Sequence, residues 1–164
     1  MENVTLSVYG DDNFCTIHPD VQSWFHFNAF KAEALKFGIK VTDAAKTGCA
    51  VPDLVPLDKL EFLKRNFRKE GHYIMAPLQL DSIRKTLTWS KSKPPYKYTG
   101  TWMISKDHFV MQQTLKSVFQ ELALHGEEVY NTWTEMIRSS ARGSPLQFYI
   151  PERGEALAGT DYCV

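Results

Sequence analysis

The feature that most constrains this chain is a Gly-Asp-Asp-Asn turn at residues 10–13, which lies between two runs of strand-forming residues. Before the turn, apolar and polar side chains alternate over Val4–Tyr9, and a period of two residues is typical of a β-strand. Glycine, aspartate and asparagine tolerate the positive φ angles that tight hairpin turns require. We therefore predict an antiparallel β-hairpin that carries two adjacent carboxylates, those of Asp11 and Asp12, at its tip.

The two carboxylates of Asp11 and Asp12 place like charges side by side. Such charges repel, so a cation between them would stabilise the pair. Mg²⁺ binds oxygen ligands and suits such a pair, with Mn²⁺ as the alternative ion. The competing interpretation is an ordinary solvated turn, because aspartate and asparagine are common turn residues.

Charge is distributed unevenly along the chain. Nineteen basic and nineteen acidic residues cancel overall, but residues 59–97 contain ten Lys or Arg against three acidic residues. This excess predicts a local basic surface in a chain without net charge. Three widely separated cysteines, Cys15, Cys49 and Cys163, form no Cys-x-x-Cys pair, which argues against a disulfide framework or a zinc site. We expect no transmembrane segment, because no apolar run approaches the length of a membrane span.

The rest of the chain alternates helical and extended patterns. We predict a helix from Asp20 to Gly38, a strand over 39–42, a loop over 43–57, and a second hairpin with strands at 59–67 and 72–75. Three helices follow Pro77, beginning near residues 79–81, 107 and 127. This order predicts an α+β fold in which an antiparallel β-hairpin, a helix, a strand and a second β-hairpin precede an α-helical part.

Several motifs in this order resemble those of the picornavirus-like (Picornavirales) RNA-dependent RNA polymerases of positive-strand RNA viruses. Tyr-Gly-Asp-Asp at 9–12 resembles motif C, and the helix, the strand and Lys46 resemble motif D. Phe-Leu-Lys-Arg at 62–65 resembles motif E, the primer-grip hairpin. Residues 77–89 and 125–131 are similar to parts of the thumb. A lone Gly-Asp-Asp is a weak signal, and the shared order of the motifs carries the resemblance.

The resemblance implies a role for each motif residue. Asp11 would be the principal ligand of the catalytic Mg²⁺ ions and Asp12 a secondary one. Lys46 would be the general acid that protonates pyrophosphate as it leaves. The alternative for Lys46 is an ordinary solvated loop lysine, because lysine is mostly exposed in any fold.

The same resemblance assigns Lys64 and Arg65 to the backbone of the primer strand near its 3′ end. Their alternative is a charged strand edge that prevents aggregation. Gly10 and Asn13 would support the geometry of the turn. The implied partners are the RNA template and primer, nucleoside triphosphates, and the upstream fingers and palm of a parent polymerase. The implied location is the host cell cytoplasm, in membrane-associated replication complexes.

The resemblance also points to parts that the eight residues before Tyr9 have no room for. A further metal-binding aspartate, the ribose-selecting motif and the basic residues of the fingers precede motif C in such enzymes. We therefore expect the C-terminal part of a polymerase from a viral polyprotein, inactive by itself. Its parts would be half of the palm at 1–76, a helical thumb at 77–152 and a flexible tail at 153–164.

Two other functions remain open at this point. One is a non-catalytic RNA-binding module that keeps the palm and thumb surface. The other is a piece of a reverse transcriptase, which the Phe-Leu-Lys-Arg hairpin and the Gly-Glu-Glu helix start at 126–128 argue against.

Overall fold

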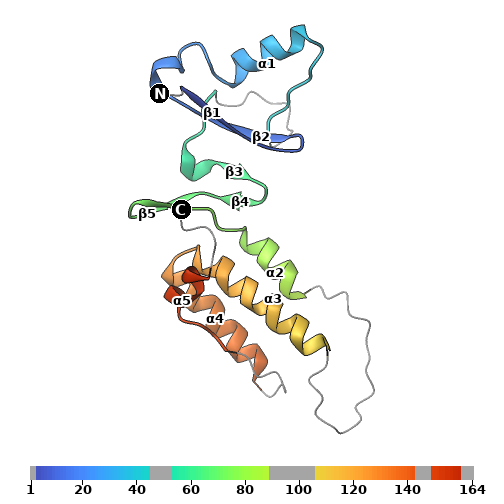
Figure 1. The fold of residues 1–164 in the computed structure, drawn as a ribbon, viewed down its shortest axis with the longest axis vertical. Coiled ribbons are helices and arrows are strands. Elements are labelled where there is room, and N and C mark those ends of the chain that lie inside the picture. The colour runs from blue at the N-terminus through green and yellow to red at the C-terminus, as the bar shows by residue number, and fades with distance from the viewer. Residues whose placement is uncertain (1–2, 45–52, 89–105, 143–148, 160–164) are drawn as a thin grey trace. The chain divides into compact units, whose positions relative to one another are not determined.

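Antiparallel strand pairs and α-helices make up the structure, a computed structural model that describes residues 3–44, 53–88, 106–142 and 149–159 (Figure 1). The chain divides into two compact units, residues 1–67 and 68–164. Both kinds of element are present, which confirms the predicted α+β class. The boundaries of a palm, a thumb and a tail at 76 and 152 stay predictions.

The first hairpin of unit 1 confirms the prediction for the N-terminal residues. Strand β1 (Val4–Tyr9) pairs antiparallel with β2 (Asp12–Ile17), in a register that runs from Val4 opposite Ile17 to Tyr9 opposite Asp12. Gly10 and Asp11 form the two-residue turn. Gly10 has a φ of 63°, whereas Asp11 has no positive φ. This combination matches a type II′ turn, whose first central position favours glycine.

The predicted helix of unit 1 begins later than expected. A short 3₁₀ helix, η1 (Pro19–Val21), comes first, and α1 (Phe27–Lys36) follows it. The start of α1 is fixed by a distant residue, because the Phe27 amide donates to the Asp53 carbonyl at 3.3 Å. The end agrees with the prediction, since Gly38 takes a left-handed φ of 75° just after the helix.

The strand predicted over 39–42 is wrong. Within the residues that the structure describes, this segment pairs with no strand. Instead, the Ile39 amide donates to the Ala34 carbonyl at 3.1 Å and closes the end of α1. A β-branched sequence forms a strand only where a neighbouring strand satisfies its backbone groups.

The long strand predicted over 59–67 is also wrong. The 3₁₀ helix η2 (Leu57–Lys59) is followed by two very short strands, β3 (Glu61–Phe62) and β4 (Arg65–Asn66), which pair antiparallel. Leu63 and Lys64 form their turn with φ angles of 51° and 63°. Positive φ at both central residues is the geometry of a type I′ turn. Segment 59–67 therefore contains a hairpin of its own.

Unit 2 opens with another short hairpin. Strand β5 (Arg68–Glu70) pairs with β6 (Tyr73–Met75), and Gly71 has a φ of 60° in the turn between them. The predicted return strand is thus confirmed. Its partner begins at Arg68, within the segment predicted to be the turn.

Helices build the core of unit 2. They are α2 (Leu80–Thr88), α3 (Lys106–Ala123), α4 (Glu127–Ala141) and α5 (Arg153–Ala158). Helix α3 buries Leu115, Val118, Phe119 and Leu122, at the i, i+3, i+4, i+7 spacing of one helix face. Ile83 of α2, Tyr130 of α4 and Ala156 of α5 complete this cluster.

Helix α5 lies where we expected a flexible tail to begin. Glu152 and Glu155 form a capping box at its start, and Ala156 is only 4% exposed. The small and polar composition of this segment concealed the helix, which is stabilised by packing against distant residues. Residues 160–164 lie outside the described residues. Across the described ranges, no helix is long and apolar enough to cross a membrane.

Candidate functional site

The structure places the two predicted metal ligands at the tip of the β1–β2 hairpin. Asp11 occupies the second position of the turn, and Asp12 is the first residue of β2, opposite Tyr9. Both residues are exposed. Asn13 lies in β2 opposite Val8, so it belongs to the strand pair directly below the turn. The turn is thus shorter than the predicted segment 10–13, since Asp12 and Asn13 already belong to β2.

An aromatic cluster joins this hairpin to the predicted primer-grip segment. The ring of Phe14 lies 4.8 Å from that of Phe62, edge to face at 66°, and 5.9 Å from that of Phe67. Asp12 and Phe14 are two residues apart in β2, so their side chains leave the same face of the strand pair. The packing thus brings the β3–β4 hairpin to the face that carries Asp12. No local sequence pattern indicates this contact, because Phe14 and Phe62 are far apart in the sequence.

The two predicted primer-binding residues occupy different positions of the β3–β4 hairpin. Lys64 is at the tip, where its Nζ lies 3.3 Å from Oε1 of Glu61, and its side chain is 69% exposed. Arg65 begins β4 opposite Phe62 and is partly buried. Exposed ion pairs contribute little to stability, so Lys64 can exchange Glu61 for a phosphate at small cost.

Lys46 lies outside the described residues. Asp53, the first described residue after it, is held by hydrogen bonds to residues at the start of α1. Its Oδ1 accepts from Asn28 Nδ2 at 2.6 Å and from His26 Nδ1 at 2.8 Å. Nδ1 of His26 also lies 3.4 Å from the Ala29 amide, and we assign its proton by the shorter contact. Although desolvation opposes it, the hydrogen bonds from Asn28 and His26 lower the pKa of the Asp53 carboxyl. Sequence reasoning missed this anchor, because the partners lie 25 and 27 residues apart.

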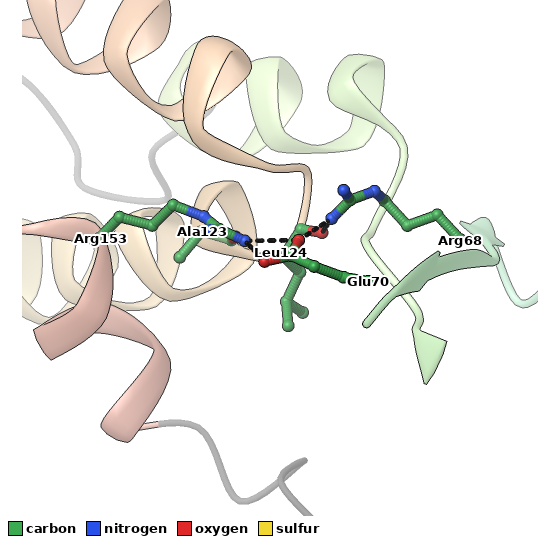
Figure 2. Close-up of polar contacts among 5 residues, drawn as sticks. All are labelled: Arg68, Glu70, Ala123, Leu124 and Arg153. Atoms are coloured by element: carbon green, nitrogen blue, oxygen red, sulfur yellow. Dashed lines mark hydrogen bonds and ion pairs between the residues drawn. The ribbon is translucent and has the colours of Figure 1, made fainter. Parts of the chain in front are cut away.

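A second polar cluster lies in unit 2 and consists of Arg68, Glu70 and Arg153 (Figure 2). We call it the Arg–Glu–Arg clamp. Nη2 of Arg153 lies 2.8 Å from each carboxylate oxygen of Glu70, and Arg68 donates to the same carboxylate through Nη1. The hydrogen bonds from Arg153 and Arg68, in that order, lower the pKa of Glu70. Arg68 is one of the ten basic residues over 59–97, but its charge is paired here.

The donor set at the hairpin tip fits a hard divalent cation. Asp11 and Asp12 provide carboxylate oxygens, the ligand type that Mg²⁺ prefers. Among the described residues there is no group of three or more His, Cys, Asp or Glu side chains that could hold a metal ion.

Comparison with known proteins gives consistent matches along the chain. The sequence model of a family described as "Viral RNA-dependent RNA polymerase" matches residues 1–138. The chain is 31% identical over 156 residues to the RNA1 polyprotein of Blackcurrant reversion association virus, covering 94% of this chain and 7% of that polyprotein.

Two further relatives come from a plant virus and an insect virus. The RNA1 polyprotein of Raspberry ringspot virus (strain cherry) is 36% identical over 131 residues, which cover 78% of this chain and 5% of that polyprotein. The replicase polyprotein of Drosophila C virus (strain EB) is 31% identical over 166 residues, which cover 98% of this chain and 8% of that polyprotein. The chain thus spans less than a tenth of the length of each of these relatives.

Proposed function

Because this chain belongs to the family of viral RNA-dependent RNA polymerases, we propose that it carries motifs C, D and E and the thumb of such an enzyme. The reaction is template-directed, Mg²⁺-dependent nucleotidyl transfer in viral RNA replication. The observation that supports this most strongly is the pair of adjacent, exposed carboxylates on the tight β1–β2 turn. Similarity to replicase and RNA1 polyproteins supports the same reaction class.

The chemistry requires charge neutralisation more than covalent help. The 3′ oxygen of the primer attacks the α-phosphorus, the bond between the α-phosphorus and the bridging oxygen breaks, and pyrophosphate leaves. Asp11 and Asp12 would hold Mg²⁺, which when bound neutralises charge on the attacking and leaving oxygens. Lys46 would donate a proton to the departing pyrophosphate.

The β3–β4 hairpin would hold the primer strand. Lys64 lies at an exposed tip and Arg65 directly beside it. Both would present their charge to phosphates of the RNA backbone. The aromatic cluster of Phe14, Phe62 and Phe67 would keep this hairpin fixed relative to the strand that carries Asp12. The helices of unit 2 would line the duplex product.

We further propose that these 164 residues are inactive by themselves. Mg²⁺ demands nearly octahedral coordination by several oxygens, and Asp11 and Asp12 alone provide too few. The remaining ligands, and the grip on the incoming triphosphate, would come from upstream fingers and palm. The template, the primer and nucleoside triphosphates would be the other partners. Replication would take place on membranes in the host cell cytoplasm.

A primer-extension assay on the polymerase that contains these residues tests the proposal. Asp11→Ala should lower the incorporation rate at least about 100-fold, because an essential ligand is lost. The matched control is Asp20→Ala, since Asp20 is an exposed carboxylate whose side chain is 81% exposed. It should leave the rate unchanged.

Two results would count against the assignment. A normal rate in Asp11→Ala would show that this carboxylate is no metal ligand. A parent protein that bound primer–template RNA but extended no primer under any metal condition would favour the non-catalytic RNA-binding module.

A further inference from the structure

The Arg–Glu–Arg clamp connects three elements that are far apart in the sequence. Arg68 and Glu70 lie in β5, on the same face because they are two residues apart. Arg153 is the first residue of α5, and it reaches Glu70 across 83 positions of the chain. Both arginines also donate to the end of α3, Arg153 Nε to the Ala123 carbonyl at 2.8 Å and Arg68 Nη1 to the Leu124 carbonyl at 3.1 Å (Figure 2).

The electrostatics of this arrangement are favourable at every contact. The carbonyl end of a helix carries partial negative charge, and the two guanidinium groups complement it. The Glu70 carboxylate then separates the two positive charges. The side chains of Arg153, Glu70 and Arg68 are only 19%, 33% and 35% exposed, so solvent screens these pairs less than it screens surface pairs.

Close packing leaves little freedom around the clamp. Gly126 has a φ of 105°, and a Cβ built there would lie 3.3 Å from Nη2 of Arg68. Helix α5 is held at other points as well, through buried Ala156 and through the Gln120 amide, which donates to the Gly159 carbonyl at 2.5 Å. The clamp is thus the point where β5 is fastened to a well-docked helix.

Strand β5 has a second face, and Lys69 lies on it. The strand alternates partly buried, exposed, partly buried from Arg68 to Glu70, and the exposed position is Lys69. Its cross-strand neighbour Ile74 is 56% exposed. In the sequence, only Phe67 separates Arg68 from β4.

We propose that Arg153 and Glu70 are positioning residues for RNA, which fasten the β5–β6 hairpin to the end of α3 so that Lys69 faces outward toward the phosphodiester backbone. This assignment rests on the proposed function. Arg68 contributes to the clamp and not to the RNA contact. Lys69 is the residue that touches the ligand, a double-stranded stretch of RNA.

The test compares the 164-residue chain with Arg153→Met, Glu70→Gln, the double variant and Lys69→Met. Arg138→Met is the matched control, because Arg138 pairs with Glu135 on an exposed surface of α4. The first measurement is amide hydrogen exchange in β5 and β6. The second is the Kd for a labelled primer–template RNA duplex at fixed salt, by fluorescence anisotropy.

Breaking the clamp should accelerate exchange in β5 and β6 roughly tenfold, the effect of losing a partly buried charge pair. The effect of the double variant should be smaller than the sum of the two single effects, because both single variants remove the Arg153–Glu70 contact while each also loses one contact of its own. The Kd should rise in parallel, roughly three- to tenfold. Lys69→Met should raise the Kd without changing the exchange, and Arg138→Met should change neither.

Each of the other outcomes would refute one named part of the proposal. Unchanged exchange in Arg153→Met, or additive effects in the double variant, would refute the clamp. Faster exchange with an unchanged Kd would refute its role in RNA binding. If Arg153→Met loses protection from exchange throughout α3 and α4, Arg153→Lys is used in its place. Lysine keeps the positive charge but lacks the planar guanidinium group that donates to both the Ala123 carbonyl and Glu70. A wild-type chain that binds no duplex would count against the proposed function, while the exchange data would still decide on the clamp.

Discussion

Gly10 shows how strongly one residue can be constrained by its backbone alone. Its φ is 63°, and a Cβ built there would meet nothing within 4 Å. Gly10→Ala should therefore destabilise the β1–β2 hairpin by about 1 kcal/mol through conformational strain without any clash. Amide hydrogen exchange of β1 and β2 would measure this as roughly fivefold faster exchange.

Gly154→Ala is the matched control for that substitution. Gly154 also lies in open space, but it sits in α5 and has no positive φ. Alanine is favoured over glycine inside a helix, so this variant should be neutral or slightly stabilising. Equal effects at both positions would refute the conformational explanation.

The lowered pKa of Glu70 predicts how the stability of the protein depends on pH. Its pKa is lowered below the ordinary value of 4.5 by the hydrogen bonds from Arg153 and Arg68. A lowered folded-state pKa contributes stability that is fully present above the unfolded value and is lost as the pH falls through the folded value. The urea midpoint of the wild type should therefore fall more steeply below about pH 4.5 than that of Glu70→Gln. Parallel pH profiles for the two proteins would contradict the prediction.

The contrast between Asp11 and Glu70 shows what a sequence reveals at the residue scale. The position of Asp11 at the hairpin tip could be predicted from the sequence, because the residues that determine a turn are local and Gly10 favours a turn at this point. The role of Glu70 could not be placed, because its partner Arg153 lies 83 positions away. No pattern in the residues around Glu70 predicts its contact with Arg153.

The β3–β4 hairpin carries an unusual turn for its sequence. Leu63 and Lys64 both have positive φ angles, although type I′ turns favour asparagine and glycine. Lys64→Gly should relieve roughly 1 kcal/mol of backbone strain and slow the exchange of β3 and β4 amides. Because it also removes a charge, it should weaken RNA-duplex binding and lower the salt slope by about one.

Lys64→Ala separates the two effects in that experiment. Alanine removes the same charge but keeps the strained backbone, so RNA affinity should fall equally while the hairpin gains no protection. If both variants bind RNA as the wild type does, Lys64 is not a primer contact.

The elements differ in how well their patterns predicted them. Helix α3 was predictable because its buried residues recur at helical spacing over two turns, from Leu115 to Leu122. The hairpin inside 59–67 was not, because neither Leu63 nor Lys64 is a typical residue for a turn with positive φ. The segment 39–42 has strand propensity, but propensity is decided by the neighbouring strand.

The two units of the chain differ in how much apolar surface they bury. In unit 2, α2 to α5 share one hydrophobic cluster around Phe119, which is 1% exposed. Among the described residues of unit 1, only Val21 and Ala34 are buried hydrophobic residues, while Leu35 is 67% and Phe37 80% exposed. Burial of apolar area is the main favourable term in folding, so we infer that unit 2 is the more stable of the two.

Helix α5 gives this difference a direct test at the scale of the whole chain. The sequence predicted a flexible tail over residues 153–164. The structure instead buries Ala156, packs Leu157 against the cluster and fastens Arg153 to Glu70. A chain that ends at Glu152 should therefore lose roughly 2–4 kcal/mol of stability in unit 2, from lost apolar burial and from loss of the Arg153–Glu70 ion pair. The control ends at Gly159, which keeps α5 and its contact with Gln120.

Hydrogen exchange of α3 and α4 should be faster in the shorter chain and unchanged in the control, because α5 covers the α3 face that carries Phe119. Equal exchange in the two truncated chains would mean that α5 contributes nothing to the stability of the core.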